Sequence, residues 1–333
     1  MEWGLIGAST IASEHVIGAI RATPGQTIGA VLSSDAARGA EYARRHDIPR
    51  ATTALDAILG DPAIGAVYIS TTNDRHHAEA MAAIAAGKHV LCEKPLAMTL
   101  AQAAGMVRAA EAAGVVFATN HHLRCAGSHI AIRNLIAAGR IGRALSLRVF
   151  HAVQLPAHLQ GWRVNDAAAG GGVIPDITVH DADTVRFLLG EDPVEVAALA
   201  GASGLGQGVE DSVMSVWSLP SGAMAMCHES FTHPFAGSGI EVHGTTGSIF
   251  ATGVMTQRPL GEIWLVDGEG RHRAPFDAHD LYERALHLFA EATMGDGAPA
   301  ATGVDGVKSL AVALAVREAA RTGRAARVDY AGF

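Results

Sequence analysis

Residues 3–12 read Trp-Gly-Leu-Ile-Gly-Ala-Ser-Thr-Ile-Ala, an apolar run that passes through Gly7 into small side chains. The run predicts a buried strand, and the apolar spacing over residues 11–20 predicts a helix directly after it. A glycine at such a turn lets the backbone approach a pyrophosphate, which then sits at the positive end of the helix dipole. Ser9 stands where the usual dinucleotide motif has its second glycine, and Ala12 where it has its third. An ordinary glycine turn ahead of a helix has the same pattern, so both interpretations stay open at this point.

The first third of the chain alternates short apolar runs with helical patterns. Thr99 and Gln102, for example, have the spacing of a capping box at the start of a helix. Strands that are apolar on both faces and separated by helices predict a doubly wound parallel sheet, the α/β Rossmann fold. The runs that predict its strands are residues 3–6, 28–32, 66–70, 89–92 and 115–119.

The pattern changes near residue 123. Two helices are predicted at residues 128–138 and 178–189, and alternating apolar and polar residues predict many short strands, the first at 145–150. Turn residues separate these strands, which predicts an α+β domain with a large, mostly antiparallel open sheet. A chain of 333 residues exceeds what one hydrophobic core usually organises. We therefore predict a dinucleotide-binding Rossmann domain over residues 1–122 and a substrate-binding α+β domain over residues 123–333.

Composition narrows the classes of partner. The net charge of −8 comes without a basic run, which argues against nucleic acid. No apolar run reaches the roughly 18 residues of a membrane-spanning helix. Cys92, Cys125 and Cys227 stand far apart, which predicts neither a disulfide framework nor a thiolate metal site. We expect a cytoplasmic protein, monomer or homodimer, that binds a small molecule and neither nucleic acid nor membrane.

The end of the second predicted strand indicates which dinucleotide is bound. NAD sites place an acidic residue there to bind the ribose 2′-hydroxyl. Here the strand ends in Ser33 and Ser34, and Arg38 follows shortly after. Two hydroxyls and a guanidinium suit a 2′-phosphate, while Asp35 lies where a helix N-cap is expected. The pattern favours NADPH as the cofactor and leaves NADH open with lower preference.

Three residues are candidates for the chemistry. Lys94 follows the fourth predicted strand at its carboxyl end, where open α/β sheets bind ligands and a lysine can polarise a carbonyl. Asp176 and His180 are four residues apart in a predicted helix, so the carboxylate can orient the imidazole as a general acid. A surface lysine and a buried histidine held by a structural aspartate explain the same residues without any chemistry.

A metal site competes with this interpretation, because acidic residues and histidines gather in several places. Adjacent residues point different ways on a helix, and no HExxH motif occurs, so we predict no metal. The residues that raise the alternative are His76, His77, His121, His122, His180, Asp181 and Asp183.

Taken together, Glu93-Lys94-Pro95, Gly171-Gly172 and Asp176-x-x-x-His180 behind a βαβ domain resemble the glucose-fructose oxidoreductase / inositol dehydrogenase / rhizopine catabolism family. The resemblance spans the whole chain. Longer motifs are similar to one bacterial subgroup of that family. The subgroup implies NADPH-dependent, regioselective reduction of the 2-keto group of 1,5-anhydro-D-fructose to 1,5-anhydro-D-mannitol. These motifs are residues 3–12, 70–73, 89–98, 119–124, 159–163 and 170–183.

The resemblance also implies roles for single residues. Lys94 and His180 would lie at the reacting carbonyl, with Asp176 binding or orienting the substrate. Either could be the final proton donor, and we prefer His180, with Lys94 as its electrostatic partner. His151, at the end of an alternating strand, is a further candidate for the sugar hydroxyls, and a solvent-facing side chain is the alternative. The cofactor would contact Gly7, Ser9, Thr10, Ile11 and Ala12 at the pyrophosphate turn, Ser33, Ser34 and Arg38 at the 2′-phosphate, Thr71, Thr72, Asn73 and His76 along the third strand's end, and Glu93, Lys94, Asn120, Trp162 and Arg163 toward the nicotinamide.

Two other functions remain as alternatives. A polyol or inositol-type dehydrogenase working in the oxidative direction would use the same Lys94, Asp176 and His180, but the missing acidic residue after the second strand argues against its usual NAD. A non-catalytic sugar or dinucleotide sensor shares the fold in this family but would have lost these three residues.

Overall fold

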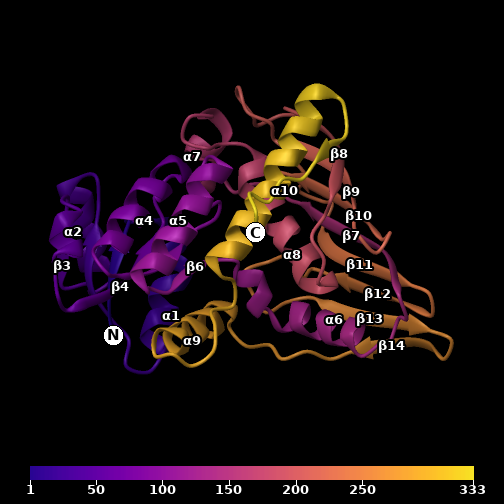
Figure 1. Ribbon diagram of the computed structural model, residues 1–333, viewed down its shortest axis with the longest axis horizontal. Coiled ribbons are helices and arrows are strands. Elements are labelled where there is room, and N and C mark those ends of the chain that lie inside the picture. Colours follow the sequence, from indigo (N-terminus) through magenta and orange to yellow (C-terminus); the bar gives the residue numbers. More distant parts are fainter. The chain divides into compact units, whose positions relative to one another are not determined.

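The computed structural model describes all residues from 1 to 333. Contacts within the chain divide it into two compact units. The first unit contains Met1–His121 and Tyr282–Val307, and the second contains His122–Leu281 and Lys308–Phe333. Figure 1 shows the helices and strands of both units with the labels used below.

A six-stranded sheet forms the centre of the first unit, with strand order β3-β2-β1-β4-β5-β6. Every neighbouring pair of strands in it is parallel. Trp3, Leu5 and Tyr68 have no exposed surface, as expected for a parallel sheet covered by helices on both faces. The strand order reverses between β1 and β4, and the predicted doubly wound α/β fold is confirmed. The strands are β1 (Glu2–Ile6), β2 (Thr27–Leu32), β3 (Arg50–Thr52), β4 (Ile64–Ile69), β5 (His89–Cys92) and β6 (Phe117–Thr119).

The helices of this unit begin where the sequence places capping residues. Asp35 Oδ1 accepts the backbone N–H of Arg38 at 2.7 Å, and Thr99 Oγ1 accepts that of Gln102 at 3.3 Å. Gly114 ends the helix that starts after Thr99, in a left-handed conformation that glycine adopts without strain. The helical segments are η1 (Ala12–Val16, a π-helical turn), α1 (Ile17–Ala22), α2 (Ala36–Arg45), α3 (Asp56–Leu59), η2 (Asn73–Arg75), α4 (His76–Ala85) and α5 (Leu100–Ala113).

The first unit also takes in a segment from late in the chain, which the sequence analysis assigned to the second domain. The Phe289 ring of α9 (Leu281–Thr293) lies 5.2 Å from that of Trp3 in β1, and Tyr282 stacks on His15 at 4.6 Å. The backbone N–H of Thr119 donates to the carbonyl of Ala301 at 3.1 Å. These long-range contacts are invisible in local sequence patterns, which is why continuous domains of 1–122 and 123–333 were expected.

A nine-stranded sheet forms the second unit, with order β14-β13-β12-β11-β7-β10-β9-β8-β15. Only β7 and β10 run parallel to each other, and the other neighbours are antiparallel. This confirms the predicted large, mostly antiparallel sheet. Its strands are β7 (Ala144–Ala152), β8 (Glu195–Gly201), β9 (Ser212–Ser218), β10 (Met224–Ser230), β11 (Ser238–Gly244), β12 (Gly247–Thr252), β13 (Glu262–Asp267), β14 (Gly270–Ala274) and β15 (Ala326–Arg327).

The two faces of this sheet differ in character. Leu147 and Val149 on β7 and Cys227 on β10 belong to the buried core, whereas Met214 and Met224 on the opposite face are more than half exposed, at 57 % and 56 %. Helix α8 covers the inner face, and most of its residues are buried (Figure 1). The helical segments here are η3 (His122–Cys125), α6 (Gly127–Ala137), α7 (Ala157–Asn165), η4 (Ile174–Thr178, a π-helical turn), α8 (Val179–Leu189) and, from Lys308 on, α10 (Gly303–Thr322).

None of the helices combines the length and the apolar character that a membrane-spanning segment requires.

Candidate active site

The turn after β1 has a geometry that only glycine accommodates. Gly7 has a φ of +113°, and a Cβ built on it would come within 3.0 Å of the Ser70 backbone. A side chain there would be strained by its backbone conformation and would also clash with the chain after β4. Because Gly7 has no side chain, nothing covers its backbone at this turn, which is where a dinucleotide's pyrophosphate is expected.

Ser9 has a local role that explains why it replaces the second glycine of the usual motif. Its hydroxyl lies 2.7 Å from that of Ser70 and accepts the backbone N–H of Ala12 at 3.2 Å. The Tyr42 hydroxyl donates to the Ser9 carbonyl at 2.9 Å. The serine therefore caps the first helical turn and ties it to the end of β4.

The residues expected at a 2′-phosphate do gather at the end of β2. Arg38 donates from Nε to the Ser33 hydroxyl at 3.2 Å and from a terminal nitrogen to the Ser34 hydroxyl at 3.0 Å. Asp35 caps α2 and accepts the N–H of Arg38, as its position in the sequence indicated. A guanidinium and two hydroxyls thus lie in one cluster at the strand end where the sequence predicts the 2′-phosphate.

His76, a predicted cofactor residue, lies after β4 and is fully enclosed by the protein. His76 has no exposed surface, and its ring nitrogens face the carbonyls of Pro95 at 2.8 Å and Thr71 at 3.2 Å. His76 therefore ties two loops together, and its contact with the dinucleotide stays a prediction. Thr71 donates to Glu79 at 2.5 Å and, like Thr72, is partly exposed.

The residue before Lys94 is fixed by two short hydrogen bonds. Glu93 Oε1 accepts the Tyr68 hydroxyl and the Asn120 side-chain amide, each at 2.6 Å. Burial, together with the charge of Glu93, raises the pKa of Tyr68 well above its ordinary value, so the phenol stays a donor. Lys94 follows this anchored carboxylate and is partly exposed. The arrangement anchors the residue next to Lys94, whose own side chain is only partly buried.

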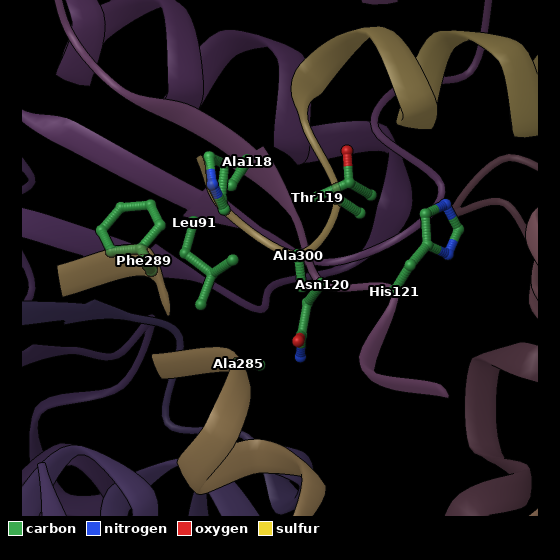
Figure 2. Close-up of a pocket in the computed structure, with 10 residues that line it drawn as sticks. Leu91, Ala118, Thr119, Asn120, His121, Ala285, Phe289 and Ala300 are labelled. Carbon is green, nitrogen blue, oxygen red and sulfur yellow. The ribbon is translucent and has the colours of Figure 1, made fainter. Parts of the chain in front are cut away.

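A small pocket lies beside Asn120 within the first unit. Figure 2 shows the Asn120 side chain pointing toward Ala285 of α9, while His121 points away from the pocket. Its other walls are mainly apolar, so they offer few polar partners to a sugar. They are Leu91, Ala118, Thr119, Phe289, Pro299, Ala300 and Ala301.

In the second unit, the glycine run before Asp176 serves packing within the protein. A Cβ on Gly171 would lie 2.5 Å from the carbonyl of Trp162, and one on Gly172, which has a φ of +113°, would lie 2.5 Å from the Glu210 carboxylate. A run of glycines can also let a ligand come close to the backbone. The structure instead uses them to bring α7 and Glu210 close to the start of η4.

Asp176 has a cationic neighbour that the sequence did not indicate. Arg163 Nε lies 3.6 Å from Asp176 Oδ1, and its guanidinium lies 4.7 Å from the centre of the Trp162 ring. Trp162 and Arg163 thus belong with Asp176 in the second unit, and contact with the nicotinamide stays a prediction for both.

His180 lies among other imidazoles. Its ring centre is 5.0 Å from that of His122, in an edge-on arrangement, and 6.3 Å from that of His151. His151 is partly buried, and its Nδ1 lies 2.9 Å from Asp181 Oδ1. His151 and His180 therefore lie in one cluster, and His151 does not point to solvent.

Asp183, one of the residues that suggested a metal, has a different partner. Arg124 donates two hydrogen bonds to its carboxylate, at 2.7 and 2.8 Å, and Arg186 lies 3.8 Å away. Guanidinium groups therefore occupy the carboxylate oxygens that a cation would need.

Comparison with known proteins places this geometry in a family. Residues 1–121 match the oxidoreductase family with an NAD-binding Rossmann fold, and residues 129–250 match the GFO/IDH/MocA C-terminal domain. The chain belongs to the GFO/IDH/MocA family. It is an oxidoreductase, and its Rossmann domain supports a nicotinamide dinucleotide as the cofactor.

Individual members of the GFO/IDH/MocA family resemble the chain over almost its whole length. 1,5-Anhydro-D-fructose reductase of Ensifer adhaerens is 56 % identical over 328 residues, which are 98 % of each chain. The crystal structure of aldose-aldose oxidoreductase from Caulobacter crescentus, complexed with glycerol, has a TM-score of 0.89 at 25 % identity and covers 98 % of this chain and 99 % of that one. Levoglucosan dehydrogenase in complex with NADH and levoglucosan shares the fold, with a TM-score of 0.87 at 23 % identity over 98 % and 99 % of the two chains.

In this member of the GFO/IDH/MocA family, some residues around the predicted site gave no sequence signal. Tyr68, which holds Glu93, lies in an apolar segment where nothing in the spacing marks it. His122, beside His180, was noted only among the metal alternatives. Asp181 was noted only as a metal alternative, yet it is the partner of His151. A pairing across elements of a sheet and a helix leaves no local pattern to detect.

Proposed function

We propose that the protein reduces the 2-keto group of 1,5-anhydro-D-fructose to 1,5-anhydro-D-mannitol with NADPH. The observation that carries the substrate is the 56 % identity, over 98 % of the chain, to a relative named 1,5-anhydro-D-fructose reductase. The chain retains Lys94, Asp176 and His180, the three residues that our sequence analysis selected for carbonyl chemistry.

The Arg38, Ser33 and Ser34 cluster supports NADPH over NADH. It offers charge-assisted hydrogen bonds to a 2′-phosphate and no carboxylate for a ribose 2′-hydroxyl, because Asp35 is engaged as a helix cap. Gly7 and the helical turn after Ser9 would hold the pyrophosphate. When bound, the cofactor supplies a hydride to the ketone carbon.

The chain's own residues would handle the proton and the developing charge. As hydride arrives, negative charge builds on the ketone oxygen, and the ammonium group of Lys94 would stabilise it. His180 would donate the proton to that oxygen. Asp176, held near Arg163, would bind or orient the sugar, and His151 would contact a sugar hydroxyl.

An assay with two substrates tests the proposal. NADPH oxidation is followed at the nicotinamide absorbance with 1,5-anhydro-D-fructose, and NADP reduction with myo-inositol is followed in parallel. We expect rapid oxidation with the anhydroketose and 1,5-anhydro-D-mannitol as its product. Turnover of the polyol with none of the anhydroketose would overturn the substrate in favour of an inositol-type dehydrogenase.

The setting of the reaction is also part of the proposal. All three cysteines are buried and none forms a disulfide, which fits a reducing cytoplasm. The partner is a small sugar ketone, with no nucleic acid or membrane involved, and the protein acts as a monomer or homodimer. Cell fractionation and light scattering test location and oligomeric state.

A further inference from the structure

Two carboxyl groups and a histidine form a buried cluster on the inner face of the nine-stranded sheet. His151 on β7 and Glu229 on β10 are direct neighbours in the parallel pairing of these strands, and Asp181 belongs to α8. The same alternation that buries Cys227 points Glu229 inward, and neither Glu229 nor Asp181 has exposed surface. The reduction proposed above gives no role to either carboxyl group.

The carboxyl oxygens of this cluster lack enough donors if both groups are ionised. Asp181 Oδ1 faces Nδ1 of His151 at 2.9 Å, but Asp181 Oδ2 and both Glu229 oxygens are buried without a hydrogen-bond partner. Asp181, Glu229 and Cys227 each offer a ligand atom within 4.8 Å of the others. Two buried carboxylates at such a distance repel strongly, and one bound proton removes the repulsion while supplying the missing donor.

The electrostatics indicate which carboxyl group keeps the proton. Burial, and then the charge of Asp181, raises the pKa of Glu229 well above its ordinary value. Burial also raises the pKa of Asp181, but the neighbouring His151 opposes that shift. Glu229 is therefore the neutral acid and Asp181 the carboxylate.

We propose that Glu229 and Asp181 share one proton and together position His151 for the sugar. The Glu229 hydroxyl donates to Asp181 Oδ2, and Asp181 Oδ1 accepts the Nδ1–H of His151. This sets the tautomer and the ring orientation of His151, and Nε2 becomes the nitrogen that meets a substrate hydroxyl near His180. The role of His151 rests on the proposed reduction, whereas the shared proton does not.

The other titratable groups near the cluster do not supply a positive charge that would balance a second carboxylate. Burial raises the pKa of the Cys227 thiol well above its ordinary value. Burial lowers the pKa of His129, on α6, to about 4, with the nearby charge of His151 adding to the shift. His180 on α8 is the remaining titratable neighbour, at 6.3 Å between ring centres from His151. The single negative charge of the carboxyl pair therefore interacts mainly with His151.

A metal ion is the competing occupant, because an aspartate, a cysteine and a glutamate can each ligate one. A metal would require both carboxyl groups ionised, and a thiolate if sulfur takes part, and binding would release those protons. Without an ion, burial raises the pKa of all three groups, so a metal would have to displace their protons. Proton sharing satisfies the carboxyl pair without an ion, and metal analysis of the purified protein decides between the two occupants.

Infrared spectroscopy of the full chain with NADPH bound tests the shared proton without any sugar. We expect a carboxylic-acid carbonyl band at neutral pH that shifts in D2O and is lost from the spectrum of Glu229→Gln. Glu241→Gln, which removes a carboxylate paired with Arg148 at 2.7 Å on β11, is the matched control and should leave the band unchanged. Identical spectra of the wild type and Glu229→Gln would overturn the shared proton. Metal analysis of the purified protein accompanies this measurement, and a stoichiometric ion that Glu229→Gln loses would overturn it as well.

Kinetics test the positioning of His151. Asp181→Asn should lower kcat by about tenfold or more with little change in the KM for NADPH, because an amide does not fix the tautomer of the ring as a carboxylate does. Glu229→Ala should also lower kcat, and Glu229→Gln should recover most of that loss, because its amide still donates to Asp181. An equal loss in Glu229→Gln and Glu229→Ala would mean that the glutamate acts as an anion. Normal kcat in Asp181→Asn would remove the positioning role even if the infrared band is present.

Discussion

The two units place their polar groups in contrasting ways. In the first unit, Ser33, Ser34 and Arg38 meet at the end of one strand and within one turn of chain, and the arginine reaches both hydroxyls at 3.0–3.2 Å. In the second unit, His151 and Asp181 come from different elements 30 residues apart and bond in the interior. The first arrangement is set by local sequence, and the second exists only when the whole sheet has formed.

Burial makes the consequences of the two arrangements unequal. Arg38 is exposed, so water and salt screen its charge and its contribution to stability is modest. The carboxyl groups of Asp181 and Glu229 have no exposed surface, so their charges interact strongly and one of them stays protonated. The comparison predicts that changes at the strand end alter cofactor choice, while changes in the interior alter turnover and pH dependence.

The largest expected effect tests whether both units contribute to turnover. Lys94 belongs to the first unit and His180 to the second. Lys94→Ala or His180→Ala should lower kcat about 10²–10⁴-fold, because each removes either charge stabilisation or proton donation in the transition state. The affinity for NADPH, measured by fluorescence titration, should stay nearly constant. His272→Ala, at a half-exposed site on β14, is the control, and normal turnover in either test variant would remove its residue from the mechanism.

The second prediction concerns the pH dependence of stability, which the buried pair should dominate. The pKa of Glu229 is raised in the folded state, so the stability linked to it is fully present below the ordinary glutamate pKa and is lost as pH rises toward the raised value. Over that window the free energy of unfolding should fall by up to about 1.4 kcal/mol per pH unit.

Denaturant unfolding of the wild type and Glu229→Gln across this pH range provides the measurement. The variant has no proton to lose and should show the flatter curve, while Glu241→Gln should follow the wild type. Parallel curves for the wild type and Glu229→Gln would show that Glu229 titrates normally. The buried carboxyl pair would then not make the stability of the second unit depend on pH.

The sequence allowed much of the first unit to be predicted and less of the second. The strand at His89–Cys92 and the caps at Asp35 and Thr99 came directly from local patterns. Segment β3 was missed because Arg50–Thr52 is a three-residue edge strand without an apolar run. The assignment of Tyr282–Val307 to the first unit depends on packing against β1 and β6, and no local signal encodes it.

The candidate site, too, could be predicted only where local sequence patterns encode it. Arg38, Ser33 and Ser34 were found because the end of the second strand of a Rossmann sheet contacts the ribose of the dinucleotide. The structural bonds of His76 could not be predicted, because spacing does not reveal that both of its nitrogens face carbonyl groups. The Glu229 carboxyl group was missed because it lies in a strand whose partner in the pairing, His151, is far away in sequence.

The third prediction tests how strictly the first unit depends on local geometry. Gly7→Ala should lower the free energy of unfolding by about 1–3 kcal/mol and weaken NADPH binding, because the new Cβ meets the Ser70 backbone at 3.0 Å with φ at +113°. Gly18→Ala, in α1 with nothing within 4 Å of its Cβ, is the matched control and should be neutral or slightly stabilising. Thermal unfolding and titration with NADPH measure both effects. Equal stability of the two variants would mean that the turn relaxes around a methyl group.

The smallest expected effect is the most selective one. Arg38→Ala should weaken NADPH binding about tenfold, as expected for the loss of a charge-assisted hydrogen bond, and should leave NADH binding within about twofold. Arg45→Ala is the control on the same helix. Arg45 lies 3.6 Å from Glu41, whereas the hydrogen bonds to Ser33 and Ser34 come from Arg38. Because the Arg38 side chain meets solvent, raising the salt concentration should narrow the difference between wild type and Arg38→Ala for NADPH. Equal weakening of both dinucleotides would show that Arg38 stabilises the turn after β2 rather than recognising the 2′-phosphate, and cofactor preference would then have to come from elsewhere in the first unit.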